Sequence, residues 1–465
     1  MKEKREGSDA SGDASSDGPG SNAVAHDAVF GDMTPGGPNY RSVGWLGTSV
    51  LMMKTQIGLG VLSIPSIFDA LGMVPGVVLL CAIGGITTWS DLVVGAFKLR
   101  HPEVYGIDDA GELMFGRVGR EVLGGAFCLL FTFTSGSAML SISIALNALS
   151  THATCTAVFV AAAAVIGFGL SSLRTLGRIS GLAWVGVTSI VVAVLTVTIA
   201  VSLQDRPAAA PRDDAVWRSD FKVVNTPTFA QAVGAVSSLV FSYAGTPAFF
   251  SIAAEMRDPR HYTQALVLCQ SVVTVVYVAV GVVVYYYCGS YVSSPALGSA
   301  GPAVKKVAYG LALPGLIASA AVMLHLASKH IFVRVLRGSR HLAANTAVHW
   351  STWLGCTSAV ALVAYLIASG IPVFNSLISL IGALLGTIIS FQPMGCMWLY
   401  DNWGGGRRAP TPRWCLMVAW SCFVVASGTF LTVAGTYSAV VGIVDDYRRS
   451  GGSAAWSCAD NSNSV

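Results

Sequence analysis

Two short segments of the chain place helix-breaking residues in the middle of long apolar runs. The first, KTQIGLGVLSIP over residues 54–65, holds Gly58 and Gly60, and the second, FSYAGTPA over residues 241–248, holds Gly245. Inside a helix, glycine costs about 1 kcal/mol and proline about 3 kcal/mol relative to alanine. Paired interruptions of this kind predict two broken membrane helices that form a substrate site. The alternative is two helices that bend at packing contacts.

The two breaks would offer complementary chemistry. A break at Gly58–Gly60 exposes N–H groups at the start of a half-helix, and these donors, together with the helix dipole, suit a carboxylate. A break near Ser242–Gly245 leaves the last carbonyls of another half-helix unpaired, and such acceptors suit an ammonium group. One site with both features matches a zwitterionic α-amino acid. The candidate substrate-binding residues are Gly58, Leu59, Gly60, Phe241, Ser242, Tyr243, Ala244 and Gly245.

Three ionisable residues within apolar runs are candidates for proton coupling, because such groups are costly inside a membrane. Lys54 lies one turn before Gly58 on the same helical face, where it would supply a fixed positive charge; the alternative is a side chain that snorkels to the cytoplasm. Asp91 would pair with Lys54 or titrate, or else be a solvated interfacial carboxylate. His325 lies near the inner end of its span and suits proton transfer.

Other polar residues have plainer interpretations. We expect Lys329 to snorkel at a helix end, Asp69 and Glu255 to mark span boundaries, and Asp108, Asp109 and Glu112 to lie in a solvated connector. Three polar residues of one span either hydrogen-bond to the site or bridge helices: Ser141, Ser143 and Asn147. Tyr243 and Phe241 would bound an apolar side-chain pocket.

Composition defines the elements that must position these residues. Of 465 residues, 53% are hydrophobic and 11% charged, against roughly 25% charged in soluble domains. Long apolar runs without strand alternation predict an all-α membrane protein rather than a β-barrel. Eleven transmembrane spans are expected, with breaks in spans 1 and 6, so that spans 1–5 and 6–10 form two equivalent halves. They cover residues 43–68, 73–97, 119–149, 153–173, 179–203, 228–254, 264–288, 306–332, 349–369, 373–400 and 414–442.

Charge distribution predicts the orientation. With the N-terminus inside, 19 of the 28 Lys and Arg residues are cytoplasmic and eight lie on the other side, Lys54 being within a span. The C-terminus is then extracellular or lumenal. We expect residues 1–42 to be a disordered cytoplasmic tail, 43–445 the transmembrane domain and 446–465 a disordered C-terminal tail. Cys155 and Cys288 both fall near the outer face, where they would be close enough in depth for a disulfide.

Several stretches resemble the amino acid/auxin permease family, and within it the fungal neutral amino acid permeases of the methyltryptophan-resistance type. They are MMKTQIGLGVLSIP (52–65), FSYAGTPAFFSIAAEMRDP (241–259), HPEVYGIDDAG (101–111) and SKHIFVRVLRGSRH (328–341). The resemblance covers about residues 45–445. It implies a LeuT-like 5+5 inverted repeat with discontinuous helices 1 and 6. In one departure, Leu51 stands where proton-coupled animal relatives have a histidine, so a mechanism based on that histidine does not carry over.

The expected function is secondary active transport, as proton-coupled symport of neutral aliphatic and aromatic amino acids by alternating access. The partners are an amino acid, a proton and the bilayer. The alternatives are an amino acid sensor on a transporter scaffold and a vacuolar exporter, with the plasma membrane favoured over the vacuole. No nucleophile–base pair, metal-ligand spacing or cofactor motif occurs in the spans, so no enzyme, metal or cofactor is expected, and the net charge of +4 predicts no nucleic-acid partner.

Overall fold

The structure is a computed structural model. It describes residues 26–27, 31–32, 42–173, 176–207, 209–211, 217–342, 345–371, 373–449 and 456–462. Most of the expected N-terminal tail, residues 1–42, lies outside these ranges. Within that tail, two short strands pair in antiparallel fashion, β1 (His26–Asp27) and β2 (Gly31–Asp32).

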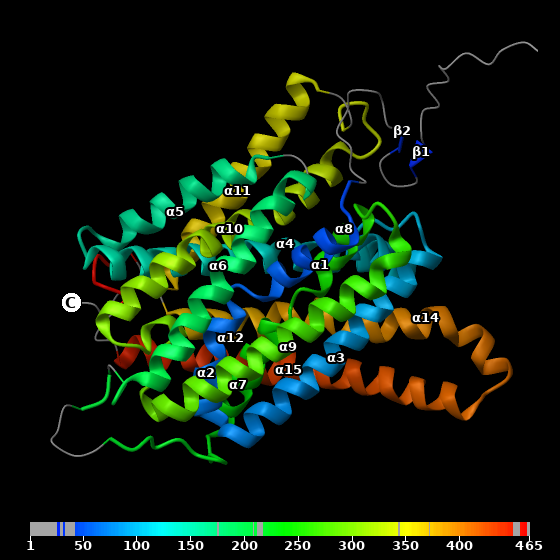
Figure 1. Cartoon of the computed structure of the whole chain (residues 1–465). Coiled ribbons are helices and arrows are strands. Elements are labelled where there is room, and N and C mark those ends of the chain that lie inside the picture. The colour runs from blue at the N-terminus through cyan, green and yellow to red at the C-terminus, as the bar shows by residue number, and fades with distance from the viewer. Residues whose placement is uncertain are drawn as a thin grey trace, which may run out of the picture.

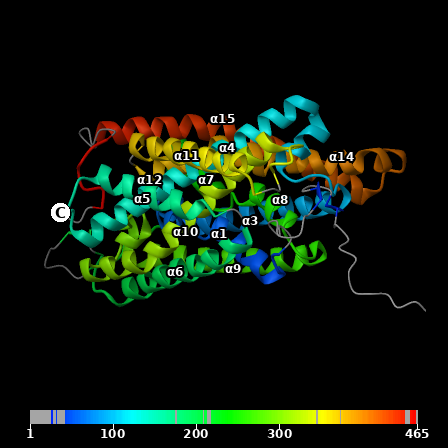
Figure 2. The same cartoon turned by 90° about the horizontal axis from the view of Figure 1, so that it is seen from above.

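All other regular elements are helices, which run roughly side by side along one direction of the molecule (Figures 1 and 2). The α-helices of the first half are α1 (Trp45–Gln56), α2 (Gly60–Leu71), α3 (Met73–Arg100), α4 (Ile107–Ser150), α5 (Thr156–Ser171) and α6 (Leu176–Leu203). Those that follow are α7 (Phe229–Ser242), α8 (Thr246–Ala254), α9 (Tyr262–Cys288), α10 (Pro302–Leu336), α11 (Ala347–Gly370), α12 (Phe374–Leu380), α13 (Thr387–Ser390), α14 (Gln392–Arg408) and α15 (Pro412–Arg449).

Short irregular helices complete the chain. Three are 3₁₀-helices, η1 (Pro259–His261), η2 (Gly289–Tyr291) and η3 (Ala296–Gly298), and η4 (Ile381–Gly386) is a π-helical segment that joins α12 to α13. The described residues contain nine helices long and apolar enough to cross a membrane, and the bent pair α1–α2 makes a tenth. Each of the eleven expected spans has a helical counterpart. The fourth, α5, has only 16 residues, so the count of eleven crossings stays a prediction.

Both expected breaks are present. Residues 57–59 separate α1 from α2, and the two half-helices meet at an angle of 46°. Residues 243–245 form a turn between α7 and α8. In this turn, the Tyr243 N–H donates to Val240 O at 3.2 Å and the Ala244 N–H to Phe241 O at 3.0 Å, which are tightened bonds in place of the regular helical ladder.

The C-terminal segment supplies the disulfide partner of Cys155. Cys155 is bonded to Cys458 rather than to Cys288, which is a buried free thiol. The segment Trp456–Ser462, expected to belong to a disordered tail, is held against the helices by this disulfide and by hydrogen bonds. The pairing was not predicted, because Cys458 lies in the expected disordered tail, 303 residues from Cys155. We call the end of the bundle that carries this segment the outer end; it lies at the left in Figure 1.

Candidate functional site

The two helix breaks face each other at the centre of the bundle. A Cβ added to Gly60 would lie 2.7 Å from the Cα of Ser242, so the start of α2 touches the backbone at the end of α7. Similarly, a Cβ on Gly245 would lie 2.5 Å from the Oγ1 of Thr55 in α1. Real Cβ atoms do not approach other atoms this closely, and only glycine permits the contact. The two breaks therefore form one structural unit.

Tyr277 in α9 connects the two breaks. Its hydroxyl lies 2.8 Å from the Gln56 carbonyl, the last of α1, and 2.8 Å from the Ser242 carbonyl, the last of α7. Its ring packs edge-on against Tyr243, with ring centroids 5.3 Å apart. A phenol has one O–H proton, so it donates to one carbonyl at a time. Tyr277 thus lies between the ends of the two half-helices and can donate to either of them.

Backbone groups at the breaks are partly engaged. The N–H of Gly58 donates to Gln56 O at 2.9 Å, whereas the N–H groups of Leu59 and Val61 donate to no acceptor in the described part of the chain. On the other side, the Phe241 carbonyl accepts from the N–H groups of Tyr243 and Ala244, the Ser242 carbonyl faces Tyr277 Oη, and the Tyr243 carbonyl accepts from Gly245 N. A carbonyl has two lone pairs, so a ligand ammonium at this end would share acceptors that are already engaged.

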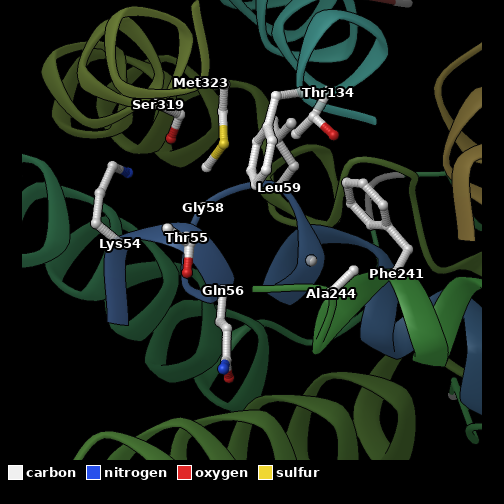
Figure 3. Close-up of a pocket in the computed structure, with 12 residues that line it drawn as sticks. Lys54, Thr55, Gln56, Gly58, Leu59, Thr134, Phe241, Ala244, Ser319 and Met323 are labelled. Carbon is white, nitrogen blue, oxygen red and sulfur yellow. The ribbon is translucent and has the colours of Figure 1, made fainter. Parts of the chain in front are cut away.

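A small cavity of about 20 Å³ lies between the breaks (Figure 3). Its volume suffices for about one water molecule, so this conformation is closed around the site. Twelve residues line the cavity: Lys54, Thr55, Gln56, Gly58, Leu59, Gly60, Phe131, Thr134, Phe241, Ala244, Ser319 and Met323. The lining contains both breaks, one amine and no carboxylate.

Five of the eight candidate binding residues line this cavity: Gly58, Leu59, Gly60, Phe241 and Ala244. The other three contribute backbone and packing instead. The Ser242 hydroxyl donates to Ser238 O at 2.9 Å, and the Tyr243 hydroxyl lies 3.2 Å from Thr274 Oγ1, away from the cavity. Gly245 makes the close contact with α1.

Sequence reasoning missed the contributions of α4 and α10. It considered Ser141, Ser143 and Asn147 in the third span, whereas the structure brings Phe131 and Thr134 to the cavity. The position of each residue along its expected span was the sequence feature that could have identified them. Thr134 and Ser319 lie at the midpoints of the expected spans 119–149 and 306–332, at the level where the breaks were expected.

Lys54 lies at the cavity and is fully buried, which contradicts the interpretation of a side chain that snorkels to solvent. Its amine has no hydrogen-bond partner among the described residues. The side chain packs against α6 beside its contact with α10, since a Cβ on Gly186 would lie 2.9 Å from the Lys54 Cε and 2.7 Å from the Ala318 Cβ. Figure 3 shows the amine beside the break at Gly58 and near Ser319.

Asp91 and His325 are buried away from this cavity. Asp91 accepts a hydrogen bond from Gln270 Nε2 at 2.6 Å, and its other carboxylate oxygen has no partner among the described residues, so it is neither solvated nor paired with Lys54. His325 Nδ1 lies 3.3 Å from the Ser171 carbonyl, and its ring packs edge-on against Trp353.

Ion pairs join helices at the inner end of the bundle. Lys329 of α10 pairs with Glu255 at the end of α8, and both are buried, so Lys329 does not snorkel and Glu255 is more than a boundary residue. The Val43 N–H donates to the Glu255 carbonyl at 3.2 Å, which ties the start of α1 to the end of α8. These contacts join α1, α8 and α10 at the inner end of the bundle.

The connector before the third span is also less solvated than expected. Asp108 and Asp109 are buried. Asp109 accepts from the Tyr105 N–H at 2.9 Å and pairs with Arg337, whereas Glu112 is exposed and pairs with Arg120 at 2.9 Å. Asp109 thereby ties the start of α4 to Arg337 at the end of α10, whereas the pair of Glu112 lies within α4.

The fold is that of the LeuT-like secondary transporters, with discontinuous helices at the site. MHP1, a nucleobase-cation-symport-1 family transporter in a closed conformation with bromovinylhydantoin bound, superposes with a TM-score of 0.56 at 13% identity, covering 96% of this chain and 99% of that one. A Na⁺-coupled sialic acid symporter in a substrate-bound outward-open state gives 0.52 at 12% identity, covering 87% and 91%.

The sequence defines the family within this class. Residues 41–440 match the transmembrane amino acid transporter protein family. The chain is 36% identical over 369 residues to a transmembrane transporter of Gibberella moniliformis, covering 78% of this chain and 77% of that protein. It is 33% identical over 358 residues to the N amino acid transport system protein of Neurospora crassa, covering 77% and 76%. The protein belongs to the transmembrane amino acid transporter family.

Proposed function

We propose that the protein is a proton-coupled symporter of neutral amino acids that works by alternating access. One observation carries this proposal: the breaks of α1–α2 and α7–α8 face each other at a cavity lined by residues of both, with N–H groups without an acceptor in the described chain at the start of α2 and the last carbonyls of α7 opposite them. The substrate carboxylate binds the N–H groups at the start of α2, including those of Leu59 and Val61. The ammonium binds at the carbonyls of Phe241 and Ser242.

The lining of the cavity supports a neutral side chain. Phe131, Phe241, Leu59 and Met323 supply apolar surface, and the lining contains no carboxylate that would hold a second positive charge. Lys54 adds a positive charge, which disfavours lysine-like substrates when it is protonated. The Neurospora crassa relative is named for amino acid transport, in agreement with a substrate of this class.

Coupling to protons is assigned to Lys54. An ionisable group buried at membrane depth is costly and marks a functional position, and Lys54 lies beside the break at Gly58 and against Gly186 of α6. Gain or loss of its proton would change the charge beside the substrate carboxylate. Asp91 with Gln270, and His325 with Ser171, are the second and third candidates for the same role.

The disulfide supports the orientation with the C-terminus outside. Cys155 and Cys458 must lie on the same side of the membrane, and disulfides persist in oxidising compartments. That side is then extracellular or lumenal, and the ion-paired end with Lys329 and Glu255 is cytoplasmic. We place the protein in the plasma membrane.

Uptake by purified protein in sealed vesicles tests this function. Labelled leucine, phenylalanine and tryptophan are offered at external pH 5 and pH 7.5, with and without sodium. The proposal expects concentrative uptake that follows the pH gradient and needs no sodium. Binding of an amino acid without its transport would favour an amino acid sensor. Transport out of vesicles that occurs only when the vesicle interior is acidic, together with a vacuolar location of the protein in cells, would favour a vacuolar exporter.

A further inference from the structure

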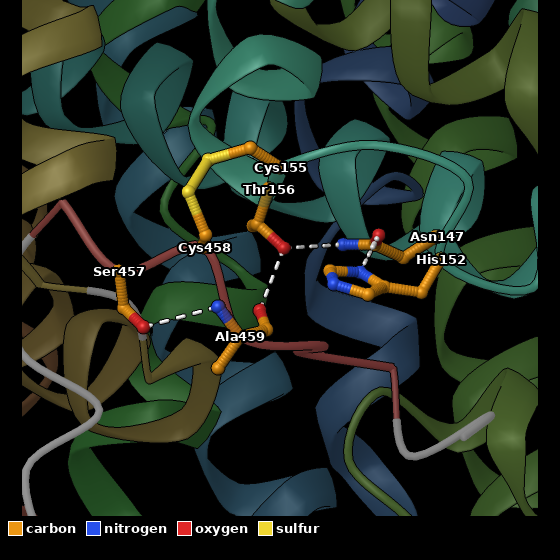
Figure 4. Close-up of a disulfide and its surroundings, with 7 residues drawn as sticks. All are labelled: Asn147, His152, Cys155, Thr156, Ser457, Cys458 and Ala459. Atoms are coloured by element: carbon orange, nitrogen blue, oxygen red, sulfur yellow. Dashed lines mark hydrogen bonds between the residues drawn. A yellow bond between two sulfur atoms is a disulfide. The ribbon is translucent and has the colours of Figure 1, made fainter.

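The C-terminal segment Trp456–Ser462 is attached to the outer end of the bundle at several points. Cys458 is bonded to Cys155 at the turn before α5, and the Thr156 hydroxyl donates to the Ala459 carbonyl at 2.7 Å (Figure 4). The residues that make these two contacts are adjacent in sequence on both sides, Cys155 next to Thr156 and Cys458 next to Ala459. They fix the middle of the C-terminal segment over the junction of α4 and α5.

Asn461 extends the attachment along α4. Its Oδ1 accepts from Asn147 Nδ2 at 2.8 Å, and its Nδ2 donates to Ser143 Oγ at 3.0 Å. Asn147 also donates to Thr156 at 2.8 Å, so one buried amide serves both α5 and the C-terminal segment. Ser143 and Asn147 therefore hold the C-terminal segment instead of lining the central cavity.

The two ends of the segment reach two further helices. The Trp456 N–H donates to the Ser369 carbonyl of α11 at 3.1 Å, and its ring packs edge-on against Tyr365, with centroids 5.5 Å apart. At the other end, the Ser462 carbonyl accepts from the Lys305 amine of α10. The segment thus spans from α11 across α4 and α5 to α10.

Two cavities at the outer end share this segment as a wall. One has a volume of about 270 Å³ and the other about 600 Å³. Asn461 borders both, together with Ile144 of α4 and Ser294 of the loop after α9. Both cavities are many times larger than the closed central cavity. The segment therefore separates two large open spaces at the outer end of the bundle.

The anchors of the segment have one property in common. The attachments described above go to α4, α5, α10 and α11, and none of them goes to the broken helices α1–α2 and α7–α8 that form the site. Any movement of the broken helices relative to α4 and α10 would leave these attachments in place. The attachments therefore fasten the segment to α4, α5, α10 and α11 at the outer end.

We propose that Trp456–Ser462 is a disulfide-anchored wall that narrows the outer entrance of the transport pathway and controls access to it. This inference rests on the proposed function only for the direction in which the substrate is transported. Removal of the segment should merge the two cavities and expose Ile144. Access of an impermeant probe to that position can be measured without any transported substrate.

The test uses labelling by a charged, membrane-impermeant thiol reagent in intact vesicles. Ile144→Cys is placed in the full chain, and separately in a chain that lacks residues 456–465 and carries Cys155→Ser, so that no thiol is released by the truncation. The same two chains without Ile144→Cys give the background from native cysteines. The matched control is Cys415→Ser in the full chain with Ile144→Cys, which removes an exposed cysteine of α15 outside the disulfide. After subtraction of the background, this change should leave the rate of labelling at Ile144→Cys unchanged.

We expect the truncated chain to be labelled at Ile144→Cys at least fivefold faster than the full chain. The change Asn461→Ala, which keeps the disulfide, should raise the rate by a smaller factor. Equal rates in the full and truncated chains, with both eluting as folded monodisperse protein, would overturn the proposal. A failure of amino acid uptake in both chains, with the rate difference present, would count against the proposed function and leave the wall established.

Discussion

Gly60 of α2 and Ser242 of α7 are in direct backbone contact, so that a Cβ on Gly60 would lie 2.7 Å from the Ser242 Cα. The contact joins the two helix breaks at the level of the cavity, and the atom in the way belongs to the backbone rather than to a flexible side chain. Any residue larger than glycine must push the start of α2 away from the end of α7.

Gly60→Ala should therefore reduce amino acid uptake by at least tenfold, because the donors of one break would no longer face the carbonyls of the other. Uptake is measured per molecule of protein in the membrane. Gly85→Ala in α3 is the control, since nothing lies within 4 Å of a Cβ at that position. Wild-type uptake by Gly60→Ala would mean that this close approach is dispensable.

Tyr277→Phe removes the hydroxyl that lies 2.8 Å from both the Gln56 and the Ser242 carbonyls. A buried acceptor left without its donor costs about 1–3 kcal/mol, so the facing ends of the two half-helices would be less stable. We expect a roughly fivefold to tenfold lower maximal uptake rate, measured in vesicles over a range of substrate concentrations. Tyr286→Phe, at an exposed position of the same helix, should behave as wild type.

Lys54→Met keeps the length of the unbranched apolar stem and removes the amine. Because that amine is the proposed carrier of the coupled proton, the variant should lose concentrative, pH-driven uptake but retain exchange of labelled for unlabelled substrate down its gradient. Lys54→Ala should behave in the same way. Lys306→Met, at the start of α10 where the amine bonds to Thr151, serves as the control. Normal pH-driven accumulation by Lys54→Met would exclude the coupling role.

The buried pair of Lys329 and Glu255 should show strong thermodynamic coupling. Loss of one partner leaves an uncompensated buried charge and costs about 3–5 kcal/mol, so Lys329→Met and Glu255→Gln should each lower the unfolding temperature. The double variant should recover most of that loss. Asp445→Asn, which breaks an exposed pair with Arg448, should change stability little. Additive losses in the double variant would show that the two residues act independently.

Acid should loosen the outer loop through Asp220. Burial raises the pKa of this carboxyl, but the hydroxyl and N–H of Ser290 and the charge of Lys222 outweigh burial, so the net pKa is lowered. A lowered native pKa stabilises the loop above the unfolded value of about 3.9, and this contribution is lost as the pH falls through the native pKa. Proteolysis of the loop should therefore stay constant from pH 7 to 5 and rise only below about pH 4. Asp220→Asn should be cleaved faster already at pH 7; an equal rate would exclude the role.

The sequence was sufficient to predict the helical class and both breaks, because glycines in the middle of an apolar run disfavour a continuous helix at those positions. It also predicted Gly58, Leu59, Gly60, Phe241 and Ala244, five of the twelve residues that line the cavity, and considered Lys54 as well. It did not predict Gln56, Phe131 or Met323, because a helix presents a different side chain to the site every 100° and its rotation is set by tertiary packing.

The burial of charged side chains was harder to predict from the sequence than the helix breaks. Lys329, Glu255, Asp108 and Asp109 lie near helix ends, where the sequence alone favours solvated side chains, but their partners lie far away in the chain and bury them. The disulfide of Cys155 was missed for a similar reason, since Cys458 is 303 residues away in a polar segment. Long-range pairs of this kind leave no local pattern.

Competition binding to the reconstituted protein tests the central claim most directly, that the facing breaks hold the two ends of a zwitterion. Labelled leucine is displaced by unlabelled leucine, by N-acetylleucine, which lacks the ammonium, and by isoamylamine, which lacks the carboxylate. We predict that leucine competes and that each analogue is at least a hundredfold weaker. If either analogue displaced the label as well as leucine does, one of the two breaks would not bind the substrate as described.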